Sequence, residues 1–314
     1  MTSFETFGLN EAYKRVQKSG DRLSEFDTLI EWDAFRPILE DLYNNKTSQG
    51  GRPNVDPVVM VKLLVIQSLY NLSDPELERQ VADRISFRKF IGFSTDVPDF
   101  STVWLFRERL IDTGKDKEIW ELYQAQLEIK GLHIEKGVLQ DATFITADPG
   151  NRSSNTSCGK EPKTRRSKDG TFSKKGSKSY FGFKLHSLMD KKHHLIRRIR
   201  TTTASVHDNR VDLSIKGETV YRDKGYFGVK PNGRNKTMRR AVRGSILSAK
   251  DIRRNLVISK IRAPIERSYA VIKRLFKGGH VLVTTLSRVH IKNVFWAFSY
   301  NLVQLGTLKR RGSW

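Results

Sequence analysis

Three acidic residues stand in surroundings that suit metal-dependent chemistry. Asp141 interrupts an apolar stretch that begins at Val138, where a charge is costly to bury unless it is paired or binds a metal ion. Asp223 follows the short stretch 219–222, and Glu266 lies among apolar residues at helical spacing. Carboxylate oxygens without cysteine suit Mg²⁺ or Mn²⁺. Two such ions, about 3.5–4 Å apart, can activate water or a 3′-hydroxyl and stabilise the leaving oxygen in a displacement at phosphorus.

Basic residues accompany Glu266 at spacings that could place them beside it. Lys273 follows it by seven residues, which on a helix brings the side chain back to within about 20° of the same face. Arg262 precedes it by four residues and shares that face if the helix extends so far back. Pro264 disfavours helical geometry in the residue before it, so a helix over 264–276 with Arg262 in its lead-in is the alternative. Nearby Arg and Lys side chains would hold DNA phosphates.

The charge of the chain is distributed unevenly. Its net charge is +23, but residues 1–130 carry −5 and residues 131–314 carry +28. A strongly basic region attracts polyanions, and its contacts with phosphates release condensed counterions. This pattern favours nucleic-acid binding, and a merely solubilising surface is the alternative. The 34 Asp and Glu residues mean that any single acid is more readily a surface or capping residue than a metal ligand.

Composition also sets limits on location. No apolar stretch of about 18 residues predicts a membrane-spanning helix, and the first ten residues do not resemble a secretion signal. The single cysteine, Cys158, cannot form an internal disulfide and fits a reducing compartment. We therefore expect no membrane partner and a cytoplasmic protein that associates with the nucleoid.

The first 130 residues predict an all-α domain. Asp56 and Pro57 begin a helix that extends to about residue 70, and Ser73 with Glu76 forms a capping box for the next one. Further helical stretches follow positions 101 and 116. The short turn at 70–74 could belong to a DNA-reading helix-turn-helix. A helical hairpin within a bundle is favoured instead, because this part of the chain is acidic.

Residues 131–314 predict a mixed α/β sheet domain. The expected strands cover 137–147, 180–189, 194–203 and 218–222, and the expected helices cover 206–215, 264–276 and 287–305. Between the first two strands, the basic stretch at about 149–179 has almost no apolar residues and predicts a flexible loop. Its Lys and Arg residues could follow a DNA backbone, or the loop could be a solvated insertion.

Several other residues have both a functional and a structural interpretation. Lys184 and His186 share one face of a predicted strand and could contact DNA, although the histidine could equally donate to a backbone carbonyl. Asp208 is predicted to serve only a first helical turn. Tyr226 is predicted to be a core aromatic after a glycine turn, and stacking on a flipped base is the alternative.

The motifs together resemble the transposases of bacterial insertion sequences, in the group named after insertion sequence five. The resemblance extends nearly end to end and rests on Gly51-Arg52-Pro53, Leu72 to Leu77, Phe87 to Gly92, Phe106 to Leu110, Asp141-Ala142-Thr143, Phe181 to His186, Ala204 to Asp208, Asp223 to Tyr226, and the spacing of Arg262, Glu266 and Lys273. One position departs from that signature, because Ser259 stands where a tyrosine is usual.

The resemblance implies a ribonuclease-H-like catalytic domain after the helical domain, with Asp141, Asp223 and Glu266 as catalytic metal ligands for two Mg²⁺ or Mn²⁺ ions. It also implies double-stranded DNA as the partner, at transposon ends and target, and a homodimer or larger assembly when two ends are synapsed. The alternative is a decayed or domesticated transposase that binds DNA without cutting it. That alternative draws on the basic stretch 230–249, which has few apolar residues where relatives often carry strand.

Overall fold

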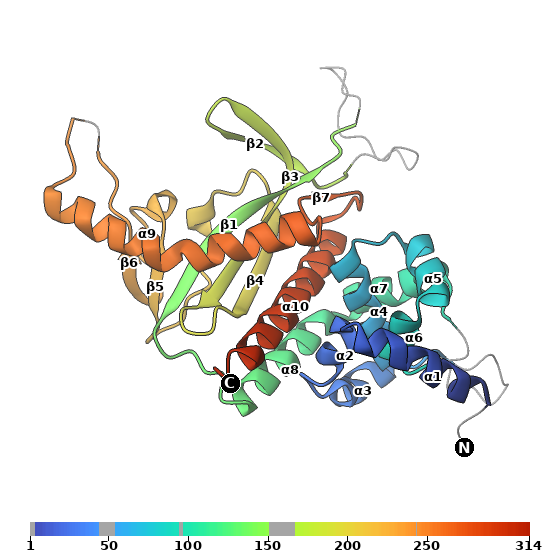
Figure 1. Ribbon diagram of the computed structural model, residues 1–314. Helices are drawn as coiled ribbons and strands as arrows, with labels where there is room; N and C mark the ends of the chain where they lie inside the picture. The colour runs from blue at the N-terminus through green and yellow to red at the C-terminus, as the bar shows by residue number, and fades with distance from the viewer. Residues whose placement is uncertain (1–3, 44–53, 94–96, 151–166, 243) are drawn as a thin grey trace. The chain divides into compact units, whose positions relative to one another are not determined.

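The computed structural model describes residues 4–43, 54–93, 97–150, 167–242 and 244–314 (Figure 1). The chain divides into two compact units. One comprises Met1–Gly131 with Asn301–Trp314, and the other comprises Leu132–Tyr300. The sequence interpretation had placed the last segment with the second domain. Gly51-Arg52-Pro53, Cys158 and most of the expected basic loop lie outside the described residues.

The first unit is helical over its described part. Its α-helices are α1 Phe4–Lys18, α2 Arg22–Asp27, α3 Arg36–Leu39, α4 Pro57–Tyr70, α5 Asp74–Asp83, α6 Ile85–Phe90, α7 Phe100–Thr113 and α8 Lys115–Ile129. The Asp56 side chain caps α4 by accepting from Val58 N at 2.8 Å, and Ser73 caps α5 by accepting from Glu76 N at 3.3 Å. Because α4 is apolar around most of its circumference, it is buried on nearly every side.

The helix predicted from residue 74 to residue 87 is two helices. Arg84 adopts an extended conformation, with φ −90° and ψ 115°, and separates α5 from α6. The local sequence contains neither glycine nor proline at this point, so the break carries no sequence signal. It lets α6 turn its apolar residues Phe87 and Phe90 into the core.

The second unit holds a seven-stranded mixed sheet. Its strands are β1 Val138–Ala147, β2 Thr171–Lys175, β3 Lys178–Asp190, β4 Ile196–Thr203, β5 Thr219–Arg222, β6 Arg234–Thr237 and β7 His280–Val281. Its helical segments are η3 Asp208–Arg210, η4 Lys224–Tyr226, α9 Ala249–Ala270 and the π-helical η5 Val271–Leu275. The final helix, α10 Leu286–Arg310, begins in this unit and ends in the first.

The strand order explains where the unit has room for a site. The path is β2-β3-β1-β5-β6, with β4 also paired to β3 and β7 also paired to β1. β1, β3 and β4 are antiparallel neighbours, whereas β5 is parallel to β1 and β6 is parallel to β5. On its second edge β1 pairs with β5 only at Val138 and Leu139, and with β7 only at Thr146 and Ala147. Along the intervening part of that edge, which includes Asp141, no strand among the described residues pairs with β1.

Close contact between β1 and β3 depends on one glycine. Gly182 pairs with Thr146 and has φ 139°, in the region that only glycine adopts readily. A Cβ there would lie 2.3 Å from the carbonyl oxygen of Ile145. Any other residue would push the two central strands apart.

Three expected elements of the second unit differ from the structure. The helix expected at 206–215 is reduced to the single 3₁₀ turn η3. The basic stretch 230–249 contains the strand β6, although it has few apolar residues, because its backbone pairs with β5 over the whole length of both strands. The stretch 171–179, which was read as loop, supplies β2 and the start of β3.

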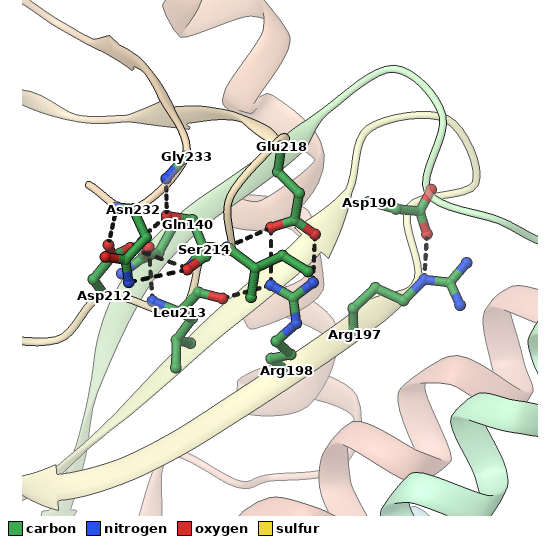
Figure 2. Close-up of polar contacts among 11 residues, drawn as sticks. Gln140, Asp190, Arg197, Arg198, Asp212, Leu213, Ser214, Glu218, Asn232 and Gly233 are labelled. Atoms are coloured by element: carbon green, nitrogen blue, oxygen red, sulfur yellow. Dashed lines mark hydrogen bonds and ion pairs between the residues drawn. The ribbon is translucent and has the colours of Figure 1, made fainter.

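Polar contacts fix the loop between η3 and β5 to the sheet (Figure 2). Buried Gln140 donates to the carbonyl oxygen of Val211 at 2.6 Å and accepts from Leu213 N at 3.3 Å. Arg198 on β4 donates to the Leu213 carbonyl at 2.6 Å and forms a two-pronged ion pair with Glu218. The loop that follows η3 is therefore held against the face of the sheet from which Gln140 and Arg198 project. None of the described helices is both long enough and apolar enough to span a membrane.

Candidate active site

An arginine joins two of the three predicted acids. Arg262 Nη2 lies 3.0 Å from Asp141 Oδ2, and Arg262 Nη1 lies 3.9 Å from Glu266 Oε1. The arginine and aspartate side chains are 5% and 17% exposed, whereas the Glu266 side chain is 64% exposed. Asp141 thus sits at the bottom of the site on β1, and Glu266 sits at its open rim on α9.

The geometry of α9 resolves the alternative left by Pro264. The helix begins at Ala249, so Arg262 lies within it, one turn before Glu266 on the same face. Pro264 lies inside the helix, where the lost N–H removes one backbone hydrogen bond without ending it. The part of the helix before the proline, residues 249–263, is absent from the helix predicted over 264–276.

A tyrosine fastens α9 to the sheet beside Asp141. Tyr269 Oη donates to the carbonyl oxygen of Asp141 at 2.7 Å and lies 2.7 Å from Ser187 Oγ on β3. Asp141 and Ser187 are paired across β1 and β3, so the two contacts fall on one face of the sheet. Because Glu266 and Tyr269 are three residues apart, they are neighbours on the surface of α9. The Tyr269 contact therefore fixes the position of Glu266 relative to β1.

Asp223 stands at the end of β5, as predicted. Its Oδ1 accepts a hydrogen bond from Gly225 N at 2.8 Å and so caps the turn η4. The negative charge of Asp223 raises the pKa of Asp141, so the two carboxylates are close enough to repel each other. Asp208, on η3, acts on Asp141 in the same direction, and η3 packs against η4.

These surroundings leave Asp141 short of positive charge. Burial raises the pKa of Asp141 from its ordinary value of 3.8 to about 7, against the opposing effect of Arg262. Asp223 and Asp208 contribute to the rise by repulsion. A carboxylate in this position is ionised more readily once another cation is bound beside it.

The chemistry of the donor set fits a hard divalent ion. The donors are carboxylate oxygens, and the hydroxyl of Tyr226 is fully buried beside Asp141, Asp208 and Asp223 with no hydrogen-bond partner in the described part of the chain. Such a hydroxyl suits a bound water or a ligand oxygen. As the side chains stand, no three His, Cys, Asp or Glu groups among the described residues enclose a metal position, and Asp141 Oδ2 is paired with the guanidinium of Arg262.

The predicted phosphate-binding cations have different environments. Arg262 is only 4% exposed and lies within ion-pair distance of Asp141 and Glu266. Lys273 is half-buried and lies in η5, the wider π-helical turn that follows α9. Single π turns occur frequently at functional sites, because they displace a side chain relative to a regular helix.

The structure places Lys184 and His186 in the interior of the sheet domain. In the register of β1 and β3 they pair with Phe144 and Ala142, so their side chains lie on the face of the sheet opposite to Asp141. Lys184 is 6% exposed and His186 is fully buried. Their contact with DNA stays a prediction.

Both side chains have internal partners that account for their burial. Lys184 Nζ donates to the carbonyl oxygen of Val206 and to Asp208 Oδ1, each at 2.8 Å. His186 Nε2 lies 2.8 Å from Thr202 Oγ1, and burial lowers the pKa of His186 to about 4, so the ring is neutral. Alternation along a strand indicates which residues share a face, but it does not indicate which face meets solvent.

Sequence reasoning missed two residues of the site. Asp208 was read as part of a first helical turn, although the block from Ala204 to Asp208 had been noticed as a motif. Tyr269 belongs to the apolar pattern around Glu266, and its spacing of three from that acid is the signal that could have indicated its role. Polar atoms at the ends of largely apolar side chains are easily overlooked in a hydrophobic pattern.

Fold and site together define a class. Three antiparallel strands, β1, β3 and β4, are extended by two strands parallel to the first, and acids stand on β1, after β5 and on the following helix. This is a mixed α/β, ribonuclease-H-like arrangement of the kind found in DDE enzymes.

Comparison with known families agrees with this class. A family described as Transposase DDE domain matches residues 133–302, and a family described as Transposase domain (DUF772) matches residues 10–109. The first match covers more than half of the 314 residues, so the chain belongs to the DDE transposase family. No solved structure matches the chain. The protein is thus a DNA transposase of an insertion sequence, and membership implies DNA substrates and metal-dependent DNA cleavage.

Proposed function

We propose that this transposase binds the terminal inverted repeats of its own insertion sequence, cleaves the DNA there and joins the free 3′-ends to a target. Asp141, Asp223 and Glu266 are the ligands of two Mg²⁺ or Mn²⁺ ions. The observation that carries the proposal is the ion-pair chain in which Arg262 links Asp141 and Glu266 while Asp223 acts electrostatically on Asp141.

Bound divalent ions would supply the activated oxygen nucleophile and neutralise the leaving oxygen. The chain's own residues have other tasks. Arg262 positions two carboxylates and is a positioning residue, Tyr269 fixes α9 against β1, and Lys273 contacts a DNA phosphate from the wider turn. Because two DNA ends must be held together before joining, the active form contains at least two protomers.

Two features favour an active enzyme over a decayed DNA-binding copy. All three acids are present, and the stretch 230–249 supplies a strand that completes the parallel side of the sheet. The missing tyrosine at Ser259 lies on an exposed position of α9.

Glu266 allows the sharpest test, because its exposed side chain can be changed without disturbing the core. We expect Glu266→Gln to reduce cleavage of a duplex bearing the element's end, with Mg²⁺ present, by about a thousandfold, since a metal supplies several kcal/mol and each 1.36 kcal/mol is a factor of ten. Glu135→Gln, which removes another exposed acid, should leave the rate unchanged. Equal cleavage by both variants would refute the assignment, and a strand-transfer assay separates a transposase from a simple nuclease.

A further inference from the structure

A basic hollow of about 400 Å³ lies at the carboxyl ends of β5 and β6. Its lining includes the side chains of Lys230, Arg239 and Arg254, together with Thr237 and the loop 227–229. Every ionisable residue that lines it is basic. Figure 1 shows α9 beside these two strands, and this helix provides Arg254.

A fully buried arginine lies next to this lining. Arg222 Nε donates to Thr237 Oγ1 at 3.0 Å, and Arg222 Nη2 donates to the carbonyl oxygen of Val229 at 2.6 Å. Both acceptors are neutral and both belong to lining residues. Arg222 is 0% exposed, its Nη1 has no hydrogen-bond partner, and no carboxylate of the described chain lies within ion-pair distance of it.

Burial lowers the pKa of Arg222 against the opposing effect of Asp212, and the buried charge adds to the positive potential of the neighbouring lining. Arg222 also precedes Asp223 in an extended segment, where consecutive side chains point to opposite faces. The guanidinium of Arg222 lies over the Tyr226 ring, 5.3 Å from its centroid. The hollow itself is distinct from the carboxylate cluster, because none of Asp141, Asp223 and Glu266 lines it.

The backbone around the hollow is fixed before any ligand binds. Buried Asn255 accepts from Arg239 N at 2.8 Å and donates to the carbonyl oxygen of Arg239 at 2.9 Å. Arg254 Nη1 donates to the carbonyl oxygen of Thr237 at 2.8 Å. The charged ends of Lys230 and Arg239, by contrast, make no ion pair with any described residue. These two cations are held on a rigid frame and remain available.

A second hollow favours an extended ligand over a small anion. It measures about 230 Å³, shares Arg239 with the first hollow and adds Arg240, although Asp251 also lines it. Two adjoining hollows that share one arginine can follow successive phosphates, which a free phosphate ion does not offer.

We propose that the larger hollow binds a backbone phosphate of duplex DNA, at a position other than the phosphodiester that is cleaved. The inference rests on the proposed function as a DNA transposase and adds to it a binding site, carried by Lys230 and Arg239.

The test measures DNA binding without cleavage. Anisotropy of a labelled duplex is recorded with a chelator present, over a series of salt concentrations, for wild type, Lys230→Gln, Arg239→Gln and the double variant. Each lost phosphate contact makes the slope of log K against log salt less steep by about 0.9. We expect this change for each single variant and about twice as much for the double variant. Lys216→Gln, at the opposite end of β5, is the matched control and should keep the wild-type slope.

The outcomes separate the two proposals. If the wild type binds DNA and all variants keep its salt slope, the hollow does not bind a DNA phosphate, while the proposed function is unaffected. Absence of salt-dependent binding by the wild type would overturn both. A thermal shift with inorganic phosphate that disappears in Lys230→Gln, while DNA slopes stay unchanged, would assign the hollow to a small anion and also overturn the proposal. Arg222 stays unaltered throughout, because it is buried in the fold.

Discussion

Two buried aspartates of the same sheet, Asp190 and Asp141, differ in how far their negative charges are balanced by neighbouring groups. Asp190, at the end of β3, is fully buried and accepts from His193 N, Leu195 N and Arg197 Nε (Figure 2 shows the last of these). Asp141 has an arginine partner but also faces other acids that repel it. The carboxylate of Asp190 has hydrogen-bond and ion-pair partners within the fold. The charge of Asp141 is only partly balanced, so a further cation beside it would be stabilising. Burial alone therefore does not mark a functional acid, but an unbalanced one does.

The largest expected effect separates the two aspartates by activity. We expect Asp141→Asn to lower DNA cleavage by about a thousandfold, because a metal ligand that supports several kcal/mol of transition-state stabilisation is lost. Burial and the neighbouring acids already disfavour the ionised form of Asp141, so its replacement by the neutral Asn should disturb folding little. Cleavage assays with Mg²⁺ and urea unfolding check this prediction. A variant that unfolds as readily as an Asp190 variant would remove the contrast.

The second prediction concerns Asp190, whose replacement should change stability and leave activity unchanged. Asp190→Asn removes the charge that balances Arg197 and should reduce the free energy of unfolding by about 3–5 kcal/mol, the usual cost of breaking a buried ion pair. Urea unfolding measures the loss. The fraction that remains folded should cleave DNA at the wild-type rate, and a loss of activity without a loss of stability would argue that Asp190 has a catalytic part.

A third prediction uses pH. Because the pKa of Asp141 is about 7 in the metal-free protein, binding of a divalent ion must displace a proton at lower pH. We expect Mg²⁺ or Mn²⁺ affinity, measured by calorimetry, to fall by about tenfold per pH unit below pH 7. In the absence of metal, the pKa lies above its unfolded value of 3.8, so stability should decrease as pH rises from about 4 to about 7. Both dependences should disappear in Asp141→Asn.

The smallest expected effect concerns the contact between helix and strand. Tyr269→Phe removes the hydrogen bonds to the Asp141 carbonyl and to Ser187. We expect a loss of about 1 kcal/mol in the free energy of unfolding, together with a drop in cleavage rate much smaller than that of Asp141→Asn. An unchanged rate and stability would show that α9 is fixed by its apolar contacts alone.

Elements with strong hydrophobic periodicity or clear capping residues could be predicted from the sequence, whereas weakly apolar elements could not. Strong periodicity and capping predicted α4, the start of α5, β1, β4 and the end of β5 close to their observed bounds. Weakly apolar segments were missed, because β6 and the first half of α9 are held by backbone pairing and by contacts with the sheet rather than by their own composition. The break at Arg84 has the same origin, since tertiary packing outweighs local propensity there.

The identity of the acids was available from the sequence, and so was the chemistry they suit. Asp141, Asp223, Glu266 and the absence of competing cysteine ligands follow from residue types, and the concentration of positive charge after residue 130 follows from counting. Those features depend only on which side chains are present and in what order.

The tertiary structure alone decided which charges remain unbalanced. The register of β1 and β3 puts Lys184 on the face away from Asp141 and pairs it with Asp208. The early start of α9 brings Arg262 between two carboxylates. Electrostatic energy depends on distance and on exclusion of water, and neither quantity is defined until residues far apart in the chain have been packed together.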